Sequence, residues 1–337
     1  MQTAPLETGS RLDPNDPDVR AAMGLEPGLL ERIAPGAVAA HRDLFGLEPE
    51  ETAAVVEDPE APVERRWLAG QLLALVGDPR IETLDPQLVS LPGGVASIGI
   101  PAEEVETVTA AWYGVGVEED WIRKEAPRHE VLVEPFSMMR YPVTNGDYRA
   151  FCLEVPEAPR PSGWRFGMYP LVRSNHPAWT VPVEGADAYA AWLRERTGRS
   201  FRLPTEAQWE YAASGGEVRE FPWGDEWDRT RCNTVEAGPV DSTPVGMFPS
   251  GASKHGILDL GGNAEEWIRD VYRPYPGSDV VVDDLVERVG EYRVTRGGCF
   301  TRFGDLTRCA RRHGWYGRDI YAVGFRLVEE PEAEGGS

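Results

Sequence analysis

Beyond Pro86 the chain changes from a helical pattern to short β-type segments, and this change limits the folds that it can adopt. The segments include LVSLPGG, ASIGI, HEVLVEPFSMMR and YRVTRGG, separated by clusters of Gly, Pro, Asn and Asp. Short runs between turn signals predict strands. Residues 214–300 are mostly irregular, and so long an irregular stretch needs aromatic side chains or bound ions to hold it. We therefore expect an α+β fold with little regular secondary structure.

Three predicted helices interrupt these strands. The first begins at Thr144 or Asn145, either of which can cap it, and runs through YRAFCLEV. The second covers residues 183–196, where alanine and tyrosine side chains recur on one face. The third opens at Thr205 with a capping-box pattern and ends at Gly215.

The chain divides into four predicted parts. Residues 1–18 are rich in Pro, Asp, Thr and Ser, which predicts disorder. Residues 19–86 form a helical unit whose last helix stops at Gly77, and this unit is too small to be stable alone, so we expect it to dock on the main domain. Residues 87–328 form that main domain. The acidic tail, residues 329–337, is expected to be disordered.

Charge and composition narrow the class of partner. A formal net charge of −22 repels phosphate, so we expect no nucleic acid partner, whereas a cationic ligand or a metal ion is easier to accommodate. The longest apolar runs, such as residues 67–76, fall short of the roughly 20 residues that cross a bilayer, so we expect no membrane partner. No signal peptide is visible. Four cysteines without paired spacing predict reduced thiols in a cytoplasmic protein.

Eight motifs follow one another in the order of a known family. They are YPVTNGDYRAF, HPAWTVPVEGADAYAAWL, RLPTEAQWEYAASGG, FPWGD, STPVGMFPSG, GILDLGGNAEEW, RVTRGG and VGFRLV. The series resembles the formylglycine-generating enzyme (sulfatase-modifying factor) family over residues 87–328. The resemblance implies a C-type-lectin-like fold with a small twisted antiparallel sheet, two packed helices and long loops held by calcium.

Calcium is therefore the expected structural cofactor. A hard cation takes six to eight oxygen ligands, which loops supply from carboxylates, amides and main-chain carbonyls. In related proteins two loops bind calcium at positions that match this chain. The first loop offers Asp259, Gly262, Ala264 and Glu266. The second loop offers Asn233, Thr234, Glu236 and Gly238.

The catalytic cysteines of the family are missing. Formylglycine-generating enzymes carry two cysteines, five apart, shortly after the Gly-Gly of the C-terminal segment, and these bind copper, which suits soft thiolates. Here CFTRFGDL follows Gly298, and Arg302 stands where the first cysteine is expected. A permanent cation cannot ligate copper. Cys299 matches a serine that lines the family's pocket and is the candidate catalytic thiol if the chain is an enzyme.

A second branch of the family resembles ergothioneine-type sulfoxide synthases, which hold non-haem iron with three histidines. These come from an added N-terminal domain with an HxxxHxE pattern, which is absent here. The five histidines are isolated: His41, His129, His176, His255 and His313. An iron triad from distant residues stays open, because spacing along the chain does not exclude it.

The C-terminal stretch after Gly298 mixes aromatic and arginine side chains, which dominate recognition surfaces. Framework residues such as Arg296, Arg308 and Arg312 separate them. The candidate ligand-binding residues are Phe300, Arg302, Phe303, Asp305, Arg311, His313, Trp315, Tyr316, Arg318 and Tyr321. With Leu306 and Asp319 they make twelve, of which we expect about half to be exposed.

The same stretch is similar to the diversified face of the variable proteins of diversity-generating retroelements. We interpret the chain as a calcium-stabilised domain that binds a protein or small-molecule ligand through residues 299–321, with Glu265 and Trp164 at the rim. The alternative is an iron- or copper-dependent, oxygen-using oxidoreductase that acts on a thiol, peptide or amino-acid substrate. In that case Cys299 or a histidine takes part.

Overall fold

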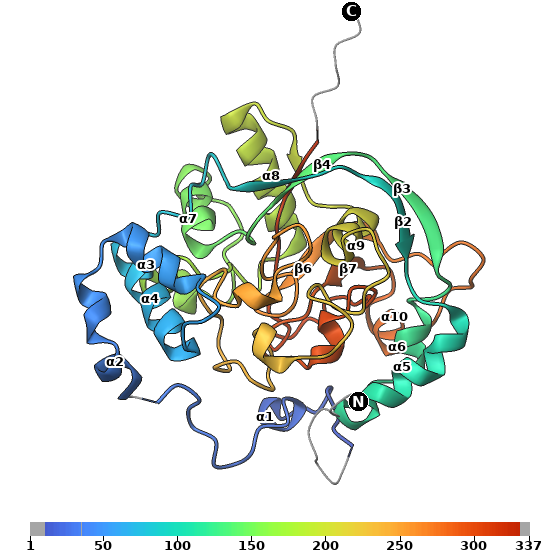
Figure 1. The fold of residues 1–337 in the computed structure, drawn as a ribbon. Coiled ribbons are helices and arrows are strands. Elements are labelled where there is room, and N and C mark those ends of the chain that lie inside the picture. Colours follow the sequence, from blue (N-terminus) through green and yellow to red (C-terminus); the bar gives the residue numbers. More distant parts are fainter. Residues whose placement is uncertain (1–10, 35, 331–337) are drawn as a thin grey trace, which may run out of the picture.

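The computed structural model describes residues 11–34 and 36–330, so parts of both predicted disordered ends lie outside the described residues. The N-terminal unit is helical, as predicted, and contains α1 (Val19–Ala22), α2 (Gly36–Ala40), α3 (Pro49–Val56) and α4 (Val63–Val76). Helices α3 and α4 lie side by side at one flank (Figure 1). Their buried side chains share a cluster with Met247 and Phe248 of the main domain. The unit is therefore docked, as the sequence predicts.

The main domain holds three small sheets. The first has the order β1-β4-β9-β5 and is antiparallel, with β1 (Leu88–Leu91), β4 (Phe136–Met139), β9 (Val328–Glu329) and β5 (Phe201–Arg202). The second pairs β2 (Gly94–Ile98) with β3 (His129–Val133). In the third, β6 (Glu265–Val271) lies between antiparallel β7 (Arg293–Arg296) and parallel β8 (Val323–Gly324). These short strands confirm the predicted fold class.

The three predicted helices are present. They are α7 (Asn145–Glu154), α8 (Val183–Thr197) and α9 (Glu206–Ser214). Thr144 caps α7, and Thr205 caps α9 in a capping box with Gln208. Gly215 ends α9 in the left-handed conformation, which glycine adopts without strain.

Three further helices lie where the sequence pattern predicts none: α5 (Val105–Trp112), α6 (Glu119–Arg123) and α10 (Asp284–Val289). In α5, the sequence VETVTAAW is rich in β-branched residues, which lose rotamer freedom in a helix. The helix is held by its packing, because Val105 and Trp112 are buried in the main core. Single turns of 3-10 helix fill the loops at Arg42–Gly46, Ala102–Glu104, Tyr113–Val115, Arg165–Gly167, Leu171–Arg173, Arg229–Arg231, Pro249–Gly251 and Gly304–Thr307.

Residues 11–18 differ from the predicted disorder. This segment, which we name the N-terminal strap, runs across the lower face of the molecule close to α5 and α6 (Figure 1). The amide of Leu12 donates to the carbonyl of Gly114 at 3.1 Å. At the other end of the domain, Glu329 belongs to β9 and pairs with Arg199. Both segments are ordered by contacts that are remote in sequence, which local composition does not reveal.

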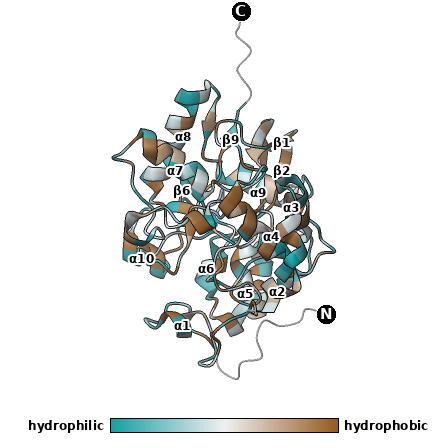
Figure 2. Ribbon diagram, turned by 90° about the vertical axis from the view of Figure 1, so that its left-hand side faces the viewer, coloured by the Kyte–Doolittle hydropathy of each residue, from teal (hydrophilic) through white to brown (hydrophobic). Residues whose placement is uncertain are grey.

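Aromatic side chains hold the long loops, as expected for irregular stretches. Trp112 of α5, Phe221 and Trp227 form one cluster with ring centroids 5.5 to 6.4 Å apart. Apolar stretches lie mostly in the interior and hydrophilic ones toward the outside (Figure 2). Within residues 11–34 and 36–330, no helix combines the length and apolar character that a bilayer crossing needs.

Candidate functional site

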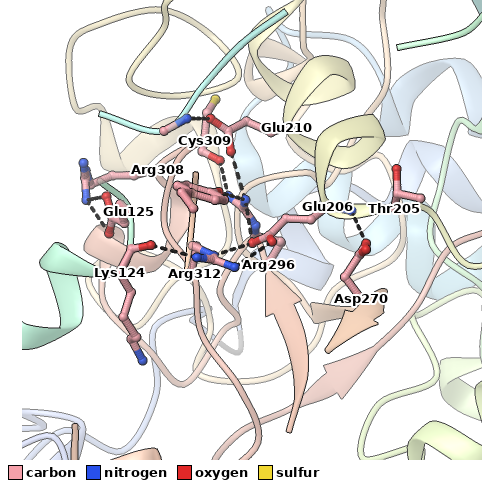
Figure 3. Close-up of polar contacts among 12 residues, drawn as sticks. Lys124, Glu125, Thr205, Glu206, Glu210, Asp270, Arg296, Arg308, Cys309 and Arg312 are labelled. Carbon is pink, nitrogen blue, oxygen red and sulfur yellow. Dashed lines mark hydrogen bonds and ion pairs between the residues drawn. The ribbon is translucent and has the colours of Figure 1, made fainter. Parts of the chain in front are cut away.

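Buried arginines fix the recognition segment, residues 299–321, to the core. Arg308 donates from Nη1 to both oxygens of Glu125, at 3.0 and 2.8 Å, and all of this pair is buried. Arg312 donates to Glu206 from Nε at 2.7 Å and from Nη2 at 2.9 Å (Figure 3). Burial acts to raise the pKa of Glu206, but the charge of Arg312 and a neighbouring arginine outweighs it and lowers the pKa. These paired charges make a rigid frame.

Arg296 extends this frame into α9. Its Nη2 lies 2.9 Å from a carboxylate oxygen of Glu206 and 2.9 Å from one of Glu210, while Nη1 donates to the carbonyl of Cys309 at 2.7 Å (Figure 3). Arg296 is fully buried. These contacts agree with the framework role that the sequence predicts for Arg296, Arg308 and Arg312.

The recognition segment is more buried than we expect from its sequence. Of the twelve candidate residues only Asp319 is exposed, and His313, Trp315 and Arg318 are half-buried. The other eight are buried: Phe300, Arg302, Phe303, Asp305, Leu306, Arg311, Tyr316 and Tyr321. The expectation that half are exposed is wrong, because the strap and the helices α6 and α10 cover this face.

A small cavity of about 20 Å³, partly open to solvent, lies in this face and has room for about one water molecule. We call it the inner cavity. It brings together seven predicted ligand-binding residues: Arg302, Phe303, Asp305, Arg311, His313, Tyr316 and Tyr321. Its wall also contains residues that the sequence does not point to, chiefly Asn15, Trp121, Lys124, Asp283 and Asp284.

The strap closes the inner cavity through polar contacts. The amide side chain of Asn15 accepts a hydrogen bond from the Tyr321 hydroxyl at 2.9 Å and donates one to Asp284 at 3.0 Å. Arg302 donates to the carbonyl of Pro14 at 3.2 Å. Arg318, which does not line the cavity itself, donates to the carbonyls of Asn15 and Asp16 at 3.2 and 2.9 Å. The strap thus occupies groups that a ligand would use.

Two charged groups of the cavity lack an oppositely charged partner. Arg302 is 4% exposed, no carboxylate of the described residues pairs with it, and its Nε has no hydrogen-bond acceptor. Asp284 accepts only from neutral donors, namely Asn15, Trp121 and Tyr316. A buried charge without a partner is costly, so Arg302 favours a ligand that carries a negative charge, while Asp284 is half-buried and partly solvated.

The other ionic groups of the wall are paired. Lys124 binds Asp283, and Arg311 lies 3.4 Å from Asp305. Burial lowers the pKa of Lys124 to about 8, although Asp283 opposes this shift.

His313 and Glu265 form a hydrogen-bonded pair at the wall. His313 Nδ1 lies 2.7 Å from Glu265 Oε1, which also accepts from Thr295 at 2.5 Å. Burial acts to raise the pKa of Glu265, but His313, Thr295 and Arg311 together outweigh it, so the pKa lies below its ordinary value. Glu265 Oε2 is buried without a hydrogen-bond partner. A carboxylate that orients an imidazole in this way is a common acid–base arrangement.

Outside the strap, the inner cavity adjoins an open groove of about 900 Å³ between α6 and α10. Its arginines are neutralised, since Arg11 pairs with Glu118 and Arg123 with Asp120. The carboxylates without a basic partner give the groove a negative charge: Asp13, Glu119, Asp284 and Glu287. Such a groove attracts cations toward the strap.

The family of the chain is established by residues 76–331, which match the model of the sulfatase-modifying factor enzyme 1-like domain. This stretch covers the three sheets, the main-domain helices and the recognition segment. The chain belongs to this family. The C-type-lectin-like fold implied by its motifs is thereby confirmed.

Relatives of this sulfatase-modifying factor domain occur in larger proteins. Serine/threonine-protein kinase Pkn1 of Chlamydia trachomatis serovar L2 is 35% identical over 214 residues, which are 58% of this chain and 33% of that protein. Hercynine oxygenase of Mycolicibacterium thermoresistibile is 31% identical over 243 residues, 60% of this chain and 53% of that protein. The chain therefore spans about a third to a half of the length of these relatives.

A solved structure of Treponema denticola variable protein 1 has the same fold. Its TM-score is 0.53 at 16% sequence identity, and the match covers 72% of this chain and 95% of that one. At this identity the likeness concerns the fold alone.

The sulfatase-modifying factor domain keeps no reactive thiol at the inner cavity. Cys299 is fully buried, does not line the cavity, and contacts Thr301 through its sulfur at 3.1 Å. Burial, with Glu265 nearby, raises the pKa of Cys299 to about 11. A protonated, buried thiol is a poor nucleophile and metal ligand, which disfavours the predicted catalytic role.

Three other predicted residues also lie away from the cavity. Phe300 packs against Trp179, with ring centroids 5.4 Å apart, and Trp315 packs against Trp267 at 6.4 Å. Trp164 is buried and donates to Asn145 at 2.6 Å instead of forming a rim.

The first predicted calcium loop is engaged internally. Glu266 accepts from the guanidinium of Arg326 at 2.6 to 2.9 Å and from Trp209 at 2.8 Å. Asp259 accepts from the amide of Gly246 at 2.6 Å, and burial raises its pKa to about 6. With its glutamate neutralised by an arginine, the loop of Asp259, Gly262, Ala264 and Glu266 fits calcium poorly.

The second predicted calcium loop fits a cation better. Asn233 Oδ1 and Glu236 Oε2 are buried without hydrogen-bond donors. A side chain at Gly238 would place its Cβ 1.8 Å from Asn233 Oδ1, so only glycine lets the loop fold back to this point. Thr234 lies between Asn233 and Glu236 in the sequence. Arg32 donates to the carbonyl of Gly238 at 2.9 Å. Calcium at either loop stays a prediction.

Asp283 and Asp284, which the sequence analysis did not assign to the cavity, have a partial signal in the sequence. Asp283 accepts from the amide of Val286 and caps α10, so the pattern Asp-Asp before LVERV marks a helix start. Asn15 left none, because its contacts reach residues about 300 positions away.

Proposed function

We propose that this chain is a ligand-binding member of the sulfatase-modifying factor family, and that its inner cavity takes a small zwitterion of the amino-acid type. The observation that carries this proposal is Arg302, a buried guanidinium without a carboxylate partner among the described residues. A ligand carboxylate can form a bidentate pair with it. Asp284 in the same wall is a carboxylate without a cationic partner and suits an amine.

Asn15 supports this choice, because its side chain is bonded to two groups that the ligand would contact. Its amide offers an acceptor to Tyr321 and a donor to Asp284, side by side. A carboxylate next to an ammonium group presents the same pair of functions with full charges, and charged hydrogen bonds are stronger than neutral ones. An amino acid can therefore compete with the strap.

The acidic groove explains why a purely anionic ligand fits less well. A free anion must pass Asp13, Glu119 and Glu287, which repel it. A zwitterion carries no net charge and still satisfies Arg302. The cationic ligand that we expect from composition alone leaves Arg302 unneutralised.

Calorimetry on the full chain tests the proposal. Each standard amino acid is compared with its decarboxylated amine and its deaminated acid. We expect only the zwitterions to bind well, and Arg302→Met to weaken binding about tenfold or more, as for loss of a charged hydrogen-bond pair. The control is Arg149→Met, an exposed arginine of α7. Equal binding of amine and amino acid, or an unchanged affinity in Arg302→Met, contradicts the proposal.

A second candidate is the oxygen-using, metal-dependent oxidoreductase. The His313–Glu265 pair favours it, because it places an oriented imidazole at the cavity wall. Similarity to a hercynine oxygenase supports it further. Within the residues that the structure describes, however, no three His, Cys, Asp or Glu side chains form a group suited to a metal ion.

Two measurements distinguish the candidates: the metal content of the purified protein and its oxygen uptake. Stoichiometric iron or copper, with oxygen uptake that His313→Ala abolishes, supports the oxidoreductase. Calcium alone, with no oxygen uptake on any amino acid, supports the ligand-binding domain. A cytoplasmic location and calcium as the structural ion remain part of our proposal for this chain.

A further inference from the structure

A second cavity, of about 510 Å³, lies apart from the inner cavity and its groove. It is bounded by α5, the end of β2, the C-terminal half of α9 and the loop of residues 217–227. Its volume falls in the range of small-molecule sites, which is about 300 to 1,000 Å³. None of its lining residues lines the inner cavity.

The wall is apolar on two sides. On α5, Val108, Ala110 and Ala111 face the space, and the small alanines leave it open. On the other side lie Phe221 and Trp227, which contact Trp112 at the end of α5. Such a lining suits the apolar or aromatic body of a ligand.

Most of the carboxylates in this wall are already neutralised. Glu210 lies 2.9 Å from Arg296, Glu220 pairs with Arg308, and Glu217 pairs with Lys254. These acids therefore add little net charge to the space.

Arg128 is the available cationic group of the wall, because Arg219 pairs with Glu217. Its Nε donates to the carbonyl of Gly99 at 3.1 Å, which fixes the guanidinium, and no carboxylate of the described residues lies within 4 Å of it. Ser214 is 3% exposed, and its hydroxyl has no hydrogen-bond partner in the described part of the chain. Glu210, one turn before Ser214, accepts from the amide of Gly99 at 2.7 Å. Arg128 and α9 thus both contact the backbone of Gly99.

We propose that this second cavity binds a small amphipathic carboxylate. Its apolar body lies among Trp112, Phe221 and Trp227, and its carboxylate accepts from Arg128 and Ser214. A fixed guanidinium gives a bidentate pair with a carboxylate. Glu104 and Asp225 at the rim oppose an anion, but both are exposed and screened by salt, so their effect is weaker than that of a direct pair.

Calorimetry with three matched probes tests the charge preference on the full chain. The probes are phenylbutyrate, phenylbutyramide and phenylbutylamine, which share one apolar body. We expect phenylbutyrate to bind at least tenfold more tightly than the amide or the amine. Tightest binding of the amine would mean that Glu104 and Asp225 decide the charge, and it would overturn the proposal. Absence of binding by all three would also overturn it.

Two variants locate the site. Arg128→Gln is expected to remove the preference for phenylbutyrate over phenylbutyramide, and Ala111→Phe to abolish binding of all probes by filling the cavity. Glu106→Phe on the exposed face of α5 is the control for Ala111→Phe, since Glu106 does not line the cavity. Unaltered binding in Ala111→Phe at an unchanged melting temperature contradicts the assignment. Arg302→Met must leave phenylbutyrate binding intact, which separates this site from the inner cavity.

Discussion

Single residues in this protein act mainly through the charge that they leave buried. Arg308 is neutralised by Glu125 and Glu220, whereas Arg302 has no carboxylate partner among the described residues. The first arrangement belongs to the frame, because a satisfied pair has nothing to offer a ligand. In the proposed function the second arrangement serves recognition, because a ligand can supply the missing charge.

Glu125→Ala is expected to destabilise the protein by about 1 to 3 kcal/mol, because Arg308 loses its two hydrogen bonds to Glu125 and keeps only Glu220 as a counter-charge. Chemical denaturation checks this. Glu130→Ala, at an exposed position of β3, is the matched control and should change the free energy of unfolding by less than about 0.5 kcal/mol. Similar effects of the two variants would show that the frame does not depend on the pair.

At the scale of elements, docking surfaces far apart in sequence decide both stability and access. Helix α4 is joined to the main domain through Gln71, whose side chain lies 2.9 Å from His176 Nε2, while Nδ1 lies 3.0 Å from Ser242. The strap is joined to the recognition segment through Asn15. We expect the first contact to respond to pH and, under the proposed function, the second to respond to ligand binding.

His176 should make the protein sensitive to acid. Burial, with Arg173 nearby, lowers the pKa of His176 from 6.5 to about 3. Below pH 6.5 the unfolded chain therefore binds a proton at His176 that the folded chain does not bind. The contribution of neutral His176 to the free energy of unfolding is complete above pH 6.5 and is lost as the pH falls. Between pH 7 and pH 5 the free energy of unfolding should fall by about 2 kcal/mol more in the wild type than in His176→Gln. Equal losses in urea denaturation would contradict this.

Loosening the strap should strengthen ligand binding. Asn15→Ala removes two hydrogen bonds, each contributing about 1 kcal/mol, and so raises the fraction of open protein. We expect an amino acid that binds the wild type to bind this variant about tenfold more tightly in calorimetry. Glu31→Ala, outside the strap, is the control. Weaker binding to Asn15→Ala would show that Asn15 belongs to the site rather than to its cover.

The elements also show what the sequence can predict. The caps of α7 and α9 depend on residues three positions apart, so Thr144, Thr205 and Gln208 reveal them directly. Helix α5 is not visible in this way, because its β-branched residues favour a strand and only burial of Val105 and Trp112 makes it a helix. Because the sequence does not predict α5, it does not predict the second cavity, which α5 borders.

For the whole molecule, the ordered motifs predict the family and its fold, but not the site. The motif order predicts the C-type-lectin-like domain, since these motifs carry the frame. The burial of Tyr316 and Tyr321 could not be predicted, because it depends on the strap and on α10. Arg302 marked the loss of copper ligands in the sequence, and the structure adds that it is buried and faces the cavity.

Calcium should stabilise the domain through the second loop. At a concentration 100-fold above its dissociation constant, a bound ion adds about 2.7 kcal/mol and raises the melting temperature by several degrees. Chelation should reverse the shift. Glu236→Gln should abolish it, whereas Glu226→Gln, at an exposed site, should not. A shift that survives Glu236→Gln would place the ion elsewhere.

Amide hydrogen exchange in the strap tests the central claim most directly. An equimolar mixture of the standard amino acids is added to the full chain, and exchange is followed in residues 11–18. The account predicts faster exchange there, including at Leu12, whose amide is bonded to Gly114, as the ligand displaces Asn15. Unchanged or slower exchange in the strap, with the ligand bound, would contradict it.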